Sequence, residues 1–185
     1  DGVHEQRLER PTLTLSGGVY WDKSGLANSD LLAVGSQFPD FVATRHDGGS
    51  LASRELRGHW FVLWWFPKAD TPGCTTEAMA FRDLAADYET RGIVVLGASF
   101  DQPEELSAFA SRHGLTCVLL SDPERELATL TRARRPETDP HSGYPRRITY
   151  AVDPNGRVAA TYEVTDPAGH PQELLRDLDT LMANR

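Results

Sequence analysis

The stretch that decides the fold is His59–Asp83, which reads HWFVLWWFPKADTPGCTTEAMAFRD. It begins with an apolar run, Trp60–Phe66, that is rich in aromatic and β-branched side chains and contains no polar residue. Such a run is typical of a central strand that is covered on both faces of a sheet. Pro67 ends the run, because proline has no N–H to donate to a sheet ladder. We therefore expect a buried strand here, with the pair Trp64-Trp65 in the core.

A helix is predicted to follow this strand after a tight loop. Thr71 is a candidate N-cap, Pro72 suits the first helical turn, and Glu77 adds negative charge near the helix start. One continuous helix is predicted to run to about residue 91, because apolar residues recur at helical spacing: Phe81, Leu84, Ala85 and Tyr88. This pattern places Cys74 at the junction between strand and helix.

The position of Cys74 favours a reactive thiolate. The first turn of a helix has free N–H groups and the positive end of the helix dipole, and both stabilise a thiolate relative to a thiol. The hydroxyl of Thr71, three residues earlier, can lie beside this sulfur. The alternative is an inert cysteine, because free cysteine is among the most buried residue types. The strand–loop–helix context favours the reactive interpretation.

The motif around this cysteine resembles a known family. Pro67-x-x-x-Thr71-x-x-Cys74 matches the P-x-x-x-T/S-x-x-C signature of the peroxiredoxins, the AhpC/TSA family. Residues 66–78, FPKADTPGCTTEA, resemble the bacterioferritin-comigratory or PrxQ-type subfamily, and the resemblance extends from about Val34 to the C-terminus. It implies a thioredoxin-like α/β fold, with a central, mostly parallel sheet flanked by helices. It also implies a thiol peroxidase, an antioxidant oxidoreductase with a redox-active cysteine.

The resemblance also implies a set of site residues. Peroxide reduction needs a thiolate nucleophile, donors that fix the peroxide, and stabilisation of charge on the leaving oxygen. Cys74 is the expected nucleophile, and Thr71 with the backbone N–H groups of Gly73 and Cys74 are the expected donors. Pro67 is expected to shield the sulfur from water and over-oxidation. Glu77 is expected either to orient the site or only to cap the helix.

The expected cation lies far away in the sequence. Arginine suits this role because it stays charged and presents several donors in a fork. Residues 147–150, RITY, resemble the R-x-T-F strand start of the family, so we choose Arg147. Arg146 is the competing choice if the register is shifted by one residue.

The chain departs from its subfamily in the step that follows oxidation. Attack on a peroxide converts Cys74 to a sulfenic acid, which a thiol must then reduce. In much of the resembling subfamily a second cysteine lies five positions further on, where this chain has Met79. Cys117, at the start of a predicted strand, is the only other cysteine. A disulfide needs Cα atoms within about 7 Å, and strand starts and helix starts lie at opposite ends of many such sheets. A structural role for Cys117 is therefore favoured over a resolving one. We therefore expect a one-cysteine cycle completed by an external thiol, either a thioredoxin-like protein or a small thiol.

Two other functions stay open from the sequence. A peroxide sensor or relay would form the same sulfenic acid but pass it to a client protein. A specialised biosynthetic redox enzyme on the same scaffold is suggested only by an unusual N-terminal segment and by a long polar loop, Thr131–Arg146.

Composition limits the partners. The chain has 185 residues, a formal net charge of −8 and only two cysteines. The negative charge argues against nucleic-acid binding, and no apolar run approaches the roughly 20 residues that span a bilayer. We expect no metal site, because the histidines are scattered along the sequence. We also expect no cofactor, because the sequence has neither a glycine-rich phosphate loop nor a C-x-x-C motif. We expect a cytoplasmic monomer or homodimer without a membrane partner.

The domain organisation is predicted to be simple. Residues 1–30 are polar and turn-rich and form an extension, whereas residues 31–185 form the peroxiredoxin domain. Alternation at Thr12–Ser16, a Gly17-Gly18 turn and Val19–Trp21 predict a small hairpin in the extension. The extension would dock on its own domain or clasp a partner subunit.

The remaining elements alternate between strands and helices, which predicts helices on both faces of the sheet and a hairpin at the end. Strands are predicted at residues 41–44, 50–52, 93–99, 116–120, 147–152 and 157–164, and helices at residues 101–113, at 126–130 and from 170 onward.

Overall fold

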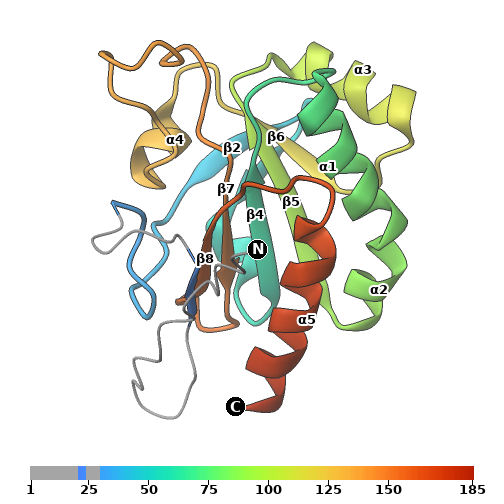
Figure 1. Ribbon diagram of the computed structural model, residues 1–185, viewed down its shortest axis with the longest axis vertical. Helices are drawn as coiled ribbons and strands as arrows, with labels where there is room; N and C mark the ends of the chain where they lie inside the picture. The colour runs from blue at the N-terminus through green and yellow to red at the C-terminus, as the bar shows by residue number, and fades with distance from the viewer. Residues whose placement is uncertain (1–20, 24–29) are drawn as a thin grey trace, which may run out of the picture.

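The computed structural model describes residues 30–185 in full and residues 21–23 by their backbone. The strands are β1 (Trp21–Lys23), β2 (Val42–Arg45), β3 (Ser50–Ala52), β4 (Trp60–Trp65), β5 (Ile93–Ser99), β6 (Val118–Ser121), β7 (Ile148–Val152) and β8 (Val158–Glu163). The helices are η1 (Ser53–Leu56), α1 (Pro72–Asp83), α2 (Ala85–Thr90), α3 (Pro103–His113), α4 (Glu126–Leu130) and α5 (His170–Ala183). The described strands form one sheet in the order β1-β8-β7-β4-β5-β6-β2-β3 (Figure 1).

The sheet is mixed, and its centre is parallel. Strands β4, β5 and β6 pair in parallel, while β7 and β8 form the predicted terminal hairpin and pair antiparallel beside β4. On the far side, β2 is antiparallel to both β3 and β6. The short strand β1 pairs in parallel with β8 at the opposite edge. The predicted α/β architecture, with β4 at its centre, is confirmed.

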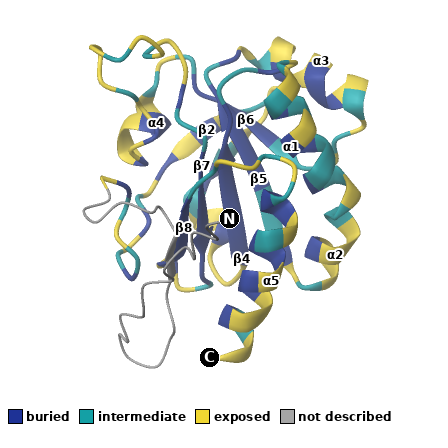
Figure 2. Ribbon diagram, in the orientation of Figure 1, coloured by how far each residue is buried: buried dark blue, intermediate teal, exposed yellow. Residues whose placement is uncertain are grey.

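Each face of the sheet has its own apolar core, because successive side chains of a strand point to opposite faces. Every residue of β4 is buried (Figure 2). Trp64 packs on the face that is covered by α1, α2, α3 and α5, and Trp65 packs on the face that is covered by α4, η1 and the segment before β2. Both tryptophans are fully buried, as the uninterrupted apolar run predicts.

The helix after Cys74 differs from the prediction, because it breaks at Leu84. The backbone there leaves helical geometry (φ −100°, ψ 5°), and α2 begins at the next residue. The break carries Tyr88 into the core, where it is fully buried and its hydroxyl donates a hydrogen bond to the Pro171 carbonyl at 2.7 Å. Packing against the start of α5 therefore overrides the continuous helical pattern of the sequence.

The other elements agree with the sequence to within a few residues. Helix α4 has the predicted bounds, and β6 begins two residues later than predicted. Residues 131–146 form the predicted long loop. The predicted hairpin of residues 12–21 lies outside the described residues except for Trp21, which belongs to β1. Within the described ranges, no helix has the length and apolar character needed to cross a membrane.

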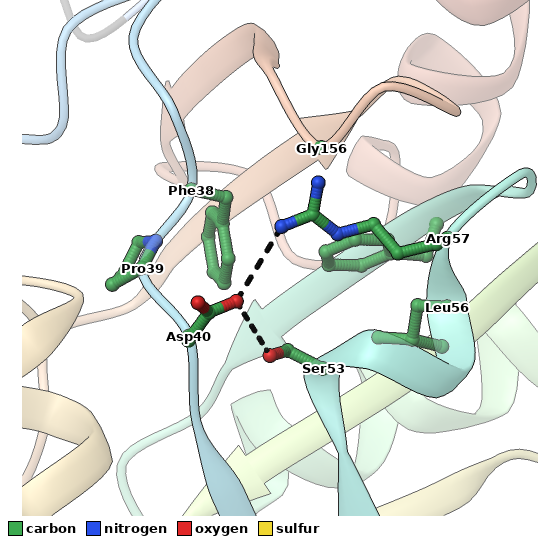
Figure 3. Close-up of a pocket in the computed structure, with 8 residues that line it drawn as sticks. Phe38, Pro39, Asp40, Ser53, Leu56, Arg57 and Gly156 are labelled. Atoms are coloured by element: carbon green, nitrogen blue, oxygen red, sulfur yellow. Dashed lines mark hydrogen bonds and ion pairs between the residues drawn. The ribbon is translucent and has the colours of Figure 1, made fainter.

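A small cavity lies at the N-terminal end of the central strand β4 (Figure 3). Asp40 accepts hydrogen bonds there from Arg57 at 3.5 Å and from Ser53 at 3.2 Å. The volume of this cavity is about 10 Å³, roughly what one water molecule needs. Cys74 lies beyond the other end of β4, so this cavity is not the functional site.

Gly97 provides a test of the packing around β4. A Cβ at this position would lie 2.7 Å from Leu119 Cδ2 and 2.9 Å from the ring of Trp64. We expect Gly97→Ala to lower the free energy of unfolding by about 1–3 kcal/mol, because overpacking a filled core costs this much. The control is Gly143→Ala, where a Cβ meets nothing within 4 Å. Equal urea midpoints for the two variants would contradict this packing.

Candidate active site

The loop between β4 and α1 places the start of the helix. Thr71 has the extended backbone of an N-cap residue, and Pro72 occupies the first turn, as predicted. The Thr71 carbonyl accepts the Thr75 N–H at 2.9 Å. The Thr71 hydroxyl does not cap the helix but donates to the Lys68 carbonyl at 2.7 Å. This bond closes the loop on itself and fixes the orientation of the Thr71 side chain.

Cys74 lies in the first turn of α1, and its side chain is fully buried. Apolar side chains of the α1 face of the sheet surround it, but one cation reaches its sulfur. Nη2 of Arg147 lies 3.3 Å from Sγ of Cys74, although the two residues are 73 positions apart in the sequence. The buried sulfur therefore has a charged partner, which an inert core cysteine would not need.

Glu77 completes a buried group of three. Its carboxylate is fully buried, and Oε2 accepts a hydrogen bond from Arg147 Nη1 at 2.7 Å. Oε1 has no hydrogen-bond partner among the described residues. Burial raises the pKa of Glu77 from 4.5 to about 7, although the charge and hydrogen bond of Arg147 oppose this shift. Glu77 therefore contacts the cation rather than the end of the helix.

Arg147 holds its charge despite partial burial. Burial lowers the pKa of its guanidinium, but the charges of Glu77 and Cys74 and the hydrogen bonds to both raise it by more. Its neighbour Arg146 points elsewhere and pairs with Asp30 at 2.8 Å and with Glu163 at 3.0 Å. Of the two arginines that the sequence left open, Arg147 is the one that meets the sulfur.

Gly73 leaves room for this contact. A Cβ at Gly73 would lie 3.2 Å from Nη2 of Arg147 and 4.0 Å from Pro167 Cγ. A larger side chain would therefore crowd the guanidinium that approaches Cys74. Pro67 is half-buried two residues after the end of β4, and no described contact joins it to the sulfur.

The second cysteine lies well away from the first. Cys117 directly precedes β6, two strands from β4 on the side opposite β7. Two strand spacings amount to about 10 Å, and Cys74 lies toward β7, where it meets Arg147. Both cysteines are free, and burial raises the pKa of Cys117 to about 12. Cys117 therefore lies on a different strand from the Arg147 contact of Cys74, and its thiol is less acidic than an ordinary one.

The sequence missed one residue of this region, Asp101. This buried side chain accepts a hydrogen bond from the Ala69 N–H at 2.9 Å, within the loop that precedes α1. The only sequence signal was its place directly after an apolar strand. Among residues 30–185, no group of three His, Cys, Asp or Glu side chains is arranged to hold a metal ion.

The chain matches the AhpC/TSA family over residues 34–161. It is 36% identical over 150 residues to a putative peroxiredoxin of Mycobacterium tuberculosis, an alignment that covers 80% of this chain and 95% of that protein. It is also 30% identical over 150 residues to the peroxiredoxin Bcp of Bacillus subtilis, with 80% and 95% covered.

Solved structures agree with the sequence relatives. A PrxQ mutant of Xylella fastidiosa superposes with a TM-score of 0.76 at 25% identity, over 83% of this chain and 98% of that one. The peroxidoxin BcpB of Mycobacterium tuberculosis superposes with a TM-score of 0.72 at 27% identity, over 82% and 97%. The thioredoxin-like fold, the family match and these relatives agree with the cysteine motif, so this chain belongs to the AhpC/TSA family as a Bcp/PrxQ-type peroxiredoxin, a thiol-dependent peroxidase.

Proposed function

We propose that this peroxiredoxin reduces hydrogen peroxide or small organic hydroperoxides in a one-cysteine cycle, in which Cys74 is the only thiol of the chain that is oxidised. The observation that carries the proposal is the isolation of Cys74. Met79 occupies the position of the local resolving cysteine, and Cys117 lies two strands away with a raised pKa.

The first half of the cycle uses the group around Arg147. The Cys74 thiolate attacks one peroxide oxygen, the O–O bond breaks, and the leaving oxygen takes a proton and departs as water or an alcohol. In our proposal Arg147 and the N–H groups of Gly73 and Cys74 stabilise the charge on that oxygen. The Thr71 hydroxyl joins them by turning its single proton from the Lys68 carbonyl to the peroxide. Pro67 shields the resulting sulfenic acid from further oxidation.

The second half needs two equivalents of an external thiol. The first thiol attacks the sulfenic sulfur of Cys74, which releases water and leaves a mixed disulfide. The second thiol attacks this disulfide, which restores Cys74 and releases the oxidised reductant. A thioredoxin-like protein or a small thiol supplies both equivalents.

We place this cycle in the cytoplasm, where thiol reductants are maintained, and in a monomer or homodimer without nucleic-acid or membrane partners. Residues 1–30 are an extension to the domain of residues 31–185, a division supported by the start of the family match at residue 34. Sedimentation analysis of the full chain tests the oligomeric state. Detection of the protein in fractionated cells of its source tests the compartment.

The role of Cys117 can be tested by repeated turnover. We expect Cys117→Ser to reduce many equivalents of hydrogen peroxide with dithiothreitol at nearly the wild-type rate, and Cys74→Ser to reduce none. A Cys117→Ser protein that stalls after one equivalent would refute the one-cysteine cycle. A wild-type protein that is oxidised rapidly, yet turns over slowly with both thioredoxin and small thiols, would instead support a peroxide sensor.

The two neighbouring arginines provide a matched pair of variants. Arg147→Lys keeps the charge but loses the fork that reaches both Cys74 and Glu77. Loss of one donor at a developing charge costs about 100- to 1,000-fold in rate. Because lysine keeps the charge, we expect the second-order rate constant with peroxide to fall less, by about 10- to 100-fold. Arg146→Lys, which alters only the contacts to Asp30 and Glu163, should stay near the wild-type rate. Equal rates for both variants would contradict the role of Arg147.

Glu77 should leave a signature in the pH dependence of stability. Its pKa rises from 4.5 to about 7 on folding, so the folded protein binds this proton more tightly than the unfolded chain does. The resulting stability is present below pH 4.5 and is lost as the pH rises through 7.

The test compares Glu77→Gln with the wild type by urea unfolding between pH 4 and about 8. Residue 77 of the variant cannot ionise, so the variant does not lose this stability as the pH rises. The difference in free energy of unfolding, variant minus wild type, should therefore increase by an amount on the order of 1–3 kcal/mol between the two ends of the range. Two parallel curves would show that folding does not raise the pKa of Glu77.

A further inference from the structure

The loop that leads into α1 is held from outside by a buried carboxylate. Asp101 follows β5, the strand next to β4, and only 3% of its surface is exposed. It accepts a hydrogen bond from the Ala69 N–H at 2.9 Å and forms an ion pair with the Lys68 ammonium. One side chain therefore holds two successive residues of the loop.

Asp101 is itself fixed by the sheet. Ser99, the last residue of β5, donates its hydroxyl to Oδ2 of Asp101 at 2.7 Å and accepts the Asp101 N–H at 3.2 Å. The hydroxyl of Ser121, the last residue of β6, donates to the Asp101 carbonyl at 2.6 Å. The carboxylate is therefore located by the ends of two central strands and not by the loop that it holds.

Hydrogen bonds joined through one rigid peptide unit lead from this carboxylate to the active site. Asp101 accepts the Ala69 N–H at 2.9 Å, and the Lys68 carbonyl of the same peptide unit accepts the Thr71 hydroxyl at 2.7 Å. The Thr71 carbonyl in turn accepts the Thr75 N–H at 2.9 Å in the turn that carries Cys74. A shift of Lys68 would therefore move both a proposed peroxide donor and the helix start.

A second contact holds the same loop but is weaker. Asp70 adopts a left-handed backbone conformation (φ +62°), which residues other than glycine rarely adopt. Its carboxylate pairs with Arg112 and lies 3.1 Å from His113 Nε2, at the end of α3. Arg112 is 58% and Asp70 39% exposed, and ion pairs between exposed side chains contribute little. The buried anchor at Asp101 is thus the main external constraint on the loop.

We propose that Asp101 is a positioning residue for peroxide reduction, which fixes Thr71 and the first turn of α1 relative to the guanidinium of Arg147. The inference rests on the proposed function of Cys74. Its physical basis is that attack on a peroxide requires the sulfur and the donors to be aligned at the same moment, and a misplacement of about 1 Å can cost about 100-fold in rate.

The test uses Asp101→Asn, which keeps the size of the side chain but cannot satisfy both Lys68 and the Ala69 N–H. The matched control is Glu105→Gln, which removes the charge of the exposed second partner of Lys68, at 3.2 Å, and keeps a side-chain oxygen that can accept the Gln102 N–H at the start of α3. Two reactions are followed in the full-length protein. Oxidation by hydrogen peroxide needs the aligned donors, whereas alkylation of Cys74 by iodoacetamide, read by mass spectrometry of its peptide, needs only an accessible thiolate.

We expect Asp101→Asn to slow peroxide oxidation about 10- to 100-fold and to change alkylation of Cys74 by less than about threefold. Glu105→Gln should leave both rates near the wild-type values. Thermal unfolding sets the assay temperature at which every variant is folded. If Asp101→Asn does not fold, Lys68→Met replaces it, because Lys68 is half-exposed and this change removes only the ion pair of the anchor. Lys68→Met should slow peroxide oxidation by a smaller factor and leave alkylation of Cys74 nearly unchanged.

Two results would overturn the inference. Unchanged peroxide oxidation in Asp101→Asn, or in Lys68→Met if that variant replaces it, would show that the anchor does not align the site. Equal losses in both reactions would show a general loss of thiolate or access rather than a loss of alignment. A wild-type Cys74 that reacts with peroxide no faster than free cysteine would overturn the proposed function itself, and this inference with it.

Discussion

The contact between the guanidinium of Arg147 and the sulfur of Cys74 is the interaction on which the site depends. A charged group in a buried place is tolerated only when it is paired and hydrogen-bonded. Arg147 meets this condition through two acceptors, Glu77 at 2.7 Å and Cys74 at 3.3 Å. The cation in turn gives the buried sulfur of Cys74 a charged partner, so the burial of Cys74 is compatible with the proposed attack on peroxide.

The sheet explains how residues so distant in sequence come to meet. Strands β4 and β7 are antiparallel neighbours, and Trp64 pairs with Thr149. Continued for two residues, this register places Arg147 level with Phe66, where the chain leaves the sheet for the loop before α1. A register shift of one residue would turn the arginine to the opposite face of the sheet. Arg146 shows this alternative, since it pairs with Asp30 and Glu163 instead.

Much of this arrangement could be predicted from the sequence, because its signals are local. The apolar run of β4, Pro72 in the first helical turn and the motif around Cys74 each depend on neighbouring residues. The break at Leu84 could not be predicted, because it results from packing of Tyr88 against α5. The burial of Glu77 and the anchor at Asp101 were missed for the same reason: each depends on which segments the sheet brings together.

The anchored loop also bears on how the oxidised cysteine would be reduced. Two cysteines five residues apart on one helix are separated by a rise of about 7.5 Å, which is beyond the usual Cα separation of a disulfide. A local resolving cysteine would therefore require the start of α1 to unwind. This chain has Met79 at that position, and Lys68, Ala69 and Asp70 are held by contacts outside the loop. An external thiol can attack the sulfenic sulfur without unwinding the helix, so a firmly held helix start is compatible with the one-cysteine cycle.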